Sequence, residues 1–165
     1  MNSLSYLFLL FALIAEIFGT IGGFGSSVFF VPIANFYFDF ESVLGLTALY
    51  HLSSNLSKIV LFKEGLDRKL LLNIGLPSVL FVVLGGLLTR VFNSQYLELV
   101  LGVFLVGLAL LFLLNSALVI NPNRRNAIVG GSLSGFSAGL LGTGGAIRGL
   151  TMAAFNLEKS VFIAT

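Results

Sequence analysis

LSYLFLLFALIAEIFGTIGGFGSSVFFVPIANFYF occupies residues 4–38, and Glu16 is the only charged residue within it. One straight helix of this length would be ~52 Å long, whereas the apolar core of a bilayer is ~30 Å thick. The run must therefore break. The segment GTIGGFG at residues 19–25 provides the break, because glycine leaves the helical conformation without a steric penalty. We expect non-helical backbone around Gly22.

The rest of the chain continues this apolar character. Residues 43–62, 70–88 and 96–114 each have the length of one membrane span, and residues 127–155 form a second long run that only Arg148 interrupts. The chain is 57% hydrophobic and 10% charged, whereas a soluble domain carries about 25% charged residues. Sixteen charged side chains, nine basic and seven acidic, cannot cover so much apolar surface. The sequence therefore predicts an all-α, polytopic transmembrane bundle.

An internal repeat relates the two long runs, since three glycines of residues 19–25 align with Gly139, Gly142 and Gly145. The repeating unit is about 118 residues long. We therefore expect two copies of a four-helix repeat, each with its first helix broken by glycines. The first copy covers residues 1–120 and the second begins at residues 121–165. On this comparison roughly 70 residues of the second unit are missing, as in a fragment or a truncated product.

Basic residues in short loops predict the orientation. They cluster after the second span and before the fifth, at Lys63, Arg68, Lys69, Arg124 and Arg125. Because such loops are cytoplasmic, the N-terminus should be cytoplasmic and residues 39–41 should lie outside, in a multi-pass protein of the cell (inner) membrane. A repeat of four spans makes the duplication parallel, unless a glycine segment is re-entrant and alters the parity.

The glycine patterns resemble those of the sulfite exporter TauE/SafE family. They read Gly-x-x-Gly-Gly-x-Gly from Gly19, leading to Val31-Pro32, and Gly-x-Gly-Gly from Gly142, followed later by Ala164-Thr165. The resemblance implies two four-helix repeats that move sulfur-containing or organic anions. The chain departs from the family pattern at Ala146, where glycine is common, at Met152, where proline is common, and in lacking the last three spans.

Broken helices inside a membrane expose backbone groups that lipid cannot satisfy, so they are tolerated where they line a wet cavity, and their free N–H groups attract anions. This reading makes both glycine segments candidate substrate sites, whereas the alternative is close helix packing. For Gly131 and Gly135, four residues apart, packing is the expectation. The candidate substrate-binding glycines are Gly22, Gly23, Gly25, Gly142, Gly144 and Gly145.

Arg148 follows the second glycine segment at a depth where an unpaired guanidinium is costly. It can bind the transported oxyanion through its planar fork of donors. Equally, it can form a structural ion pair with Glu16, the other charge in a broken segment. The sequence leaves both interpretations open.

Polar residues also share one face of the second span, because His51, Asn55 and Lys58 are four and three residues apart. They can line a pathway together with Glu16, with His51 as a proton carrier. In the alternative interpretation Lys58 is an anchor that extends to the interface and Asn55 forms a hydrogen bond between helices.

Several functions are excluded by composition. One histidine, no cysteine and no clustered carboxylates leave no metal site, no cofactor and no catalytic triad, so an enzyme is not expected. A net charge of +2, scattered along the chain, does not indicate nucleic-acid binding. The sequence predicts a secondary carrier whose partners are membrane lipid and a small anionic substrate; homo-oligomers stay open. The alternative is a non-transporting membrane scaffold.

Overall fold

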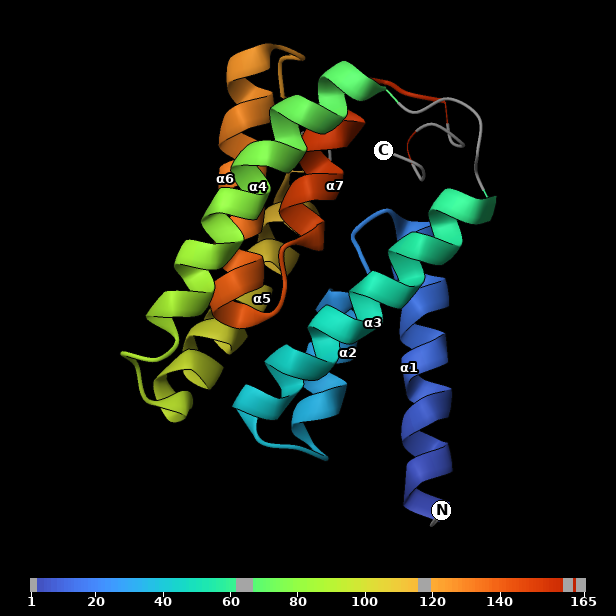
Figure 1. Ribbon diagram of the computed structural model, residues 1–165, viewed down its shortest axis with the longest axis vertical. Coiled ribbons are helices and arrows are strands. Elements are labelled where there is room, and N and C mark those ends of the chain that lie inside the picture. Colours follow the sequence, from blue (N-terminus) through green and yellow to red (C-terminus); the bar gives the residue numbers. More distant parts are fainter. Residues whose placement is uncertain (1–2, 62–66, 116–119, 159–161, 163–165) are drawn as a thin grey trace.

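The computed structural model describes residues 3–61, 67–115, 120–158 and 162, and within them all regular secondary structure is helical (Figure 1). Lys63, Ala164 and Thr165 lie outside the described residues. The helices are α1 (Ser3–Gly22), α2 (Ser27–Asn35), α3 (Phe40–Leu61), α4 (Arg68–Leu88), α5 (Ser94–Leu114), α6 (Arg124–Leu141) and α7 (Gly145–Ala153).

The first long run forms a hairpin of two helices. Helix α1 ends at Gly22, and the chain reverses through Gly23 and Gly25, whose φ angles of 71° and 79° favour glycine. Helix α2 then runs back along α1, so that the ring of Phe8 lies 5.3 Å from the ring of Phe38. The N–H of Gly25 donates to the carbonyl of Gly19 at 3.2 Å and closes the turn.

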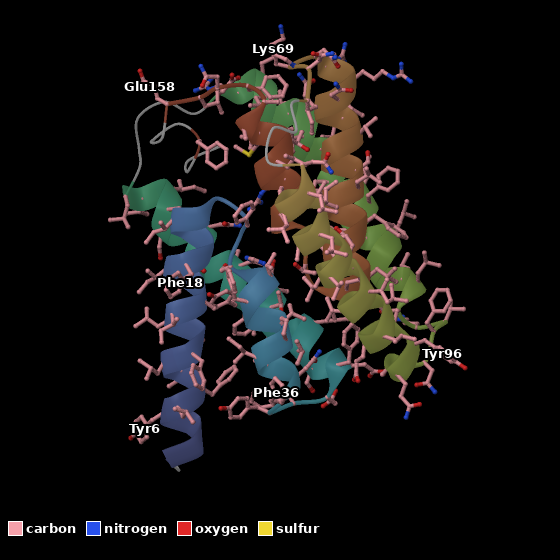
Figure 2. The ribbon with its side chains drawn as sticks, turned by 180° about the vertical axis from the view of Figure 1, so that it is seen from behind. Tyr6, Phe18, Phe36, Lys69, Tyr96 and Glu158 are labelled. Carbon is pink, nitrogen blue, oxygen red and sulfur yellow. The ribbon has the colours of Figure 1, made fainter. Side chains whose placement is uncertain are left out.

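Helix α3 runs parallel to α1. The hydroxyl of Tyr50 donates to the carbonyl of Ala12 at 3.0 Å, and four residues later the hydroxyl of Ser54 donates to Glu16. Contacts therefore advance along both helices in the same direction. The turn at residues 36–39 consequently lies at the same end as the start of α1, as the labels Tyr6 and Phe36 show in Figure 2.

This geometry corrects one expectation. The sequence placed residues 39–41 on the opposite side of the membrane from the N-terminus, because residues 4–38 were counted as one crossing. They instead form a hairpin whose start and end lie at the same end of the molecule. At the turn, the N–H and the hydroxyl of Ser42 donate to the carboxylate of Asp39 at 2.9 and 2.7 Å, which lowers the pKa of Asp39 and caps α3.

Helices α4 and α6 form the most extensive contact between helices, and glycines make it possible. A Cβ atom added at Gly135 would lie 2.1 Å from the carbonyl oxygen of Ser78, and one added at Gly131 would lie 2.3 Å from that of Ile74. The two backbones thus approach as closely as small residues allow, and the packing role expected for both glycines is confirmed. Because the contacts again advance together, α4 and α6 are parallel. Their basic first turns lie at the same end of the molecule.

Helices α4 and α5 are long and apolar enough to cross a membrane, among the residues that the structure describes. Most of their large apolar side chains are exposed, such as Leu72 at 64% and Leu99 at 66%. A soluble protein would bury these side chains, whereas lipid solvates them.

Helices α6 and α7 form a second hairpin. Gly142, with φ 74°, ends α6, and the hydroxyl of Ser134 donates to the carbonyl of Gly144 at 2.8 Å. Helix α7 then returns along α6, where a Cβ atom at Gly130 would lie 2.1 Å from the hydroxyl of Thr151. Figure 1 shows that α1 and α6 run in opposite directions. The first helices of the two hairpins are therefore antiparallel, whereas four simple crossings would make them parallel.

Candidate functional site

The two glycine loops meet each other in the interior of the molecule. A Cβ atom at Gly25 would lie 2.7 Å from the Cα of Gly145, and one at Gly149 would collide with the carbonyl oxygen of Gly23. Beside them, the Ser27 hydroxyl donates to Thr143 across 116 residues of sequence at 3.4 Å. The two hairpins therefore touch through backbone atoms at the breaks in their helices.

A cavity of about 330 Å³ opens at this junction, which is within the size range of small-ligand sites. Both hairpins and helices α3 and α4 contribute to its wall. The lining residues are Gly19, Thr20, Gly23, Gly25, Asn55, Lys58, Ile59, Leu71, Gly145, Arg148, Gly149, Met152 and Phe162.

Arg148 supplies one of the two cationic groups among the described residues of this wall. It occupies the first turn of α7, where its N–H donates to the carbonyl of Gly144 at 3.1 Å. Within the described part of the chain, its guanidinium forms no ion pair and no hydrogen bond. The carboxylate of Glu16 is paired with Lys58 instead, at 2.7 Å. The structural pair between Arg148 and Glu16 is therefore absent from this structure.

Lys58 supplies the second cationic group, and Asn55 lies beside it on the same face of α3. His51, which the sequence placed on this face, is not among the lining residues; its ring lies 5.8 Å from that of Tyr50. Glu16 also lies outside this cavity and lines a second, largely apolar one between α1 and α3.

The predicted glycines divide into two groups. Gly23, Gly25 and Gly145 line the cavity together with Arg148 and Asn55. The other three shape the loops instead. Gly142 ends α6, Gly144 accepts the Ser134 hydrogen bond, and Gly22 is the last residue of α1.

Several lining residues were missed in the sequence. Met152 could have been found, because it follows Arg148 by four residues and so shares its face of α7. No sequence pattern predicts that Leu71 and Phe162 line the cavity, since their proximity to the glycines depends on tertiary packing.

The electrostatics of the cavity favour an anion. Two cationic side chains line it, and no described lining residue carries a carboxylate. Gly145 begins α7 at this wall, and the free N–H groups of a helix N-terminus add positive potential. Among the described residues no group of three histidine or acidic side chains could hold a metal ion.

Comparison with known proteins identifies a family for this chain. No curated protein and no solved structure matches the chain. Residues 8–165 match the family model described as sulfite exporter TauE/SafE, which covers nearly the whole chain. The chain therefore belongs to the TauE/SafE sulfite exporter family of membrane transport proteins.

Proposed function

We propose that this protein is a secondary carrier that binds a small sulfur oxyanion, sulfite or a sulfonate, in the cavity between its two glycine loops. The observation that carries the proposal is the position of Arg148 in a cavity that has no lining carboxylate among the described residues. Lys58, the other described cationic lining residue, is paired with Glu16 from outside this cavity. A guanidinium without a partner among the described residues is suited to a ligand oxyanion, which its planar fork binds through two hydrogen bonds. A passive scaffold would have no use for such a cavity.

We infer that the chain is built on an inverted repeat, with residues 1–120 as the first unit and residues 121–165 as the start of the second. Hairpin α1–α2 and hairpin α6–α7 support this inference, since each breaks at glycines and their first helices run in opposite directions. In carriers of this kind the substrate binds where the repeats meet, and one unit rocks against the other. The glycine contact would then be the pivot.

We further propose that the end bearing Arg68, Lys69, Arg124 and Arg125 is cytoplasmic, by the distribution of basic residues. The N-terminus lies at the other end of the molecule and is then outside (Figure 2). This reverses the N-terminal orientation expected from sequence, because that expectation counted residues 4–38 as a crossing.

Cysteine labelling tests this orientation, since the chain has no cysteine of its own. Arg125→Cys should resist an impermeant thiol reagent in intact cells, whereas Glu41→Cys and Gln95→Cys, both exposed at the other end, should react. All three should react after the cells are permeabilised. If Arg125→Cys is the only one of the three variants that is labelled in intact cells, the proposed orientation is wrong and the basic end lies outside.

The proposed site is tested by sulfite transport into proteoliposomes. Arg148→Gln should lower sulfite affinity by about 10- to 100-fold, because a hydrogen bond to a charged group contributes ~1.5–3 kcal/mol. Arg148→Lys should restore little of it, since an ammonium group lacks the planar fork. Both variants should reach the membrane in wild-type amounts. Transport by Arg148→Gln at the wild-type rate would contradict the site.

A further inference from the structure

Glu16 has an unusual environment for a carboxylate in a membrane helix. One oxygen, Oε1, accepts hydrogen bonds from Thr20 at 3.0 Å and from Ser54 at 2.5 Å, and pairs with Lys58 at 2.7 Å. The other oxygen, Oε2, is buried without a hydrogen-bond partner among the described residues. The same is true of the hydroxyl of Ser26, which lies near this carboxylate.

A proton on Oε2 would give this oxygen a hydrogen bond to donate. The Ser26 hydroxyl, which is 2% exposed, precedes α2 directly and lies near the Glu16 carboxylate, can accept that bond. Lys58 is the cation that keeps this partly buried carboxylate ionised. An ionised carboxylate that loses its cation in such a place is costly, so withdrawal of Lys58 favours a protonated Glu16. Tyr50 is the other titratable group close to the pair, and its hydroxyl is already bonded to the carbonyl of Ala12.

Lys58 connects this carboxylate to the anion cavity. It lines the cavity of about 330 Å³ that contains Arg148, and it also lines the cavity of about 620 Å³ between α1 and α3 that contains Glu16. His51 is the remaining titratable side chain of this region, and the charges of Arg148, Glu16 and Lys58 all act on it. The ammonium group therefore lies between the Glu16 carboxylate and the cavity in which an anion would bind.

We propose that Glu16 is a proton-binding site coupled to anion binding through Lys58, an inference that rests on the proposed function. The incoming anion takes Lys58 as its second cationic ligand beside Arg148. The carboxylate that loses Lys58 takes up one proton from water on Oε2, and the Ser26 hydroxyl accepts its hydrogen bond. Anion and proton then bind together, and each raises the affinity for the other by the same factor. The carrier thus moves a proton with its anion.

Calorimetry on the full chain in detergent tests this linkage, with sodium sulfite as the probe. Titrations in two buffers of different ionisation enthalpy give the protons taken up per bound sulfite. The wild type should take up more protons than Glu16→Gln, and the protonation of sulfite itself is common to both and cancels. Glu16→Gln should bind sulfite about fivefold more tightly or better, because Lys58 no longer has a competing carboxylate. Lys58→Met should bind sulfite more weakly and lose the extra proton.

Ser54→Ala gives a milder variant in case Glu16→Gln does not fold. It removes a donor to ionised Glu16, so sulfite should bind more tightly than in wild type. Ser53→Ala is the matched control, since that hydroxyl donates to the carbonyl of Tyr50 and should change nothing. Equal proton uptake in wild type and Glu16→Gln, with sulfite bound, would overturn only the coupling role of Glu16. If the wild-type protein binds sulfite as weakly as Arg148→Gln does, both the proposed function and the coupling are wrong.

Discussion

Gly135→Leu is expected to abolish accumulation of the folded protein in the membrane. Even the first atom of the new side chain would lie 2.1 Å from the backbone oxygen of Ser78, and backbone cannot rotate away as a side chain can. Helices α4 and α6 would have to separate along their shared face. Overpacking of this kind costs ~3 kcal/mol or more when the neighbour cannot move. The measurement is the amount of monodisperse protein in detergent, by fluorescence-detected size exclusion of a tagged chain.

The matched control is Gly102→Leu in α5. Gly102 is also a glycine of a long apolar helix, but a Cβ atom there would meet nothing within 4 Å. Its leucine should point into lipid, and the amount and melting temperature of the protein should stay at or above the wild-type values, because glycine is a poor helix former. Equal loss in both variants would show that leucine itself, not the α4–α6 contact, is responsible.

Composition and run length were sufficient to predict a helical membrane protein, because a chain with so few charges has no other way to solvate its surface. The spacing of Gly131 and Gly135 was sufficient to predict close packing, since a four-residue period is a property of one helix face. Neither the composition nor the glycine spacing could predict the direction of α2. After a break at glycine the chain can continue in the same direction or turn back, and only tertiary contacts, such as that of Phe8 with Phe38, decide between the two.

The candidate site was predictable to a similar depth. Glycines and a charge in a long apolar run identify where a broken helix and a ligand could meet, and Arg148, Gly145 and Gly25 do line one cavity. The partner of Glu16 was not predictable. Arg148 and Lys58 were both available in the sequence, and the choice of Lys58 follows from the parallel packing of α1 and α3, which brings position 58 level with position 16.

Gly149→Ala should leave the protein in the membrane but lower sulfite transport by about tenfold or more. Its methyl group would collide with the carbonyl oxygen of Gly23 and would force the two glycine loops apart where they form the cavity wall. Overpacking costs ~1–3 kcal/mol, and ~1.4 kcal/mol at the binding site already corresponds to a tenfold change. Since α6 holds α7 through other contacts, including the Ser134 hydroxyl on Gly144, the second hairpin itself should remain folded.

The control for this variant is Gly45→Ala, a helical glycine of α3 whose added Cβ would lie in open space. It should transport sulfite at the wild-type rate. Comparing the two separates the contact between the hairpins from the general effect of alanine on a glycine-rich membrane protein. If Gly149→Ala transports as well as Gly45→Ala, then the junction of the two loops tolerates extra volume. In that case the close approach of Gly23 and Gly149 serves packing alone, and the pivot between the two units must lie elsewhere.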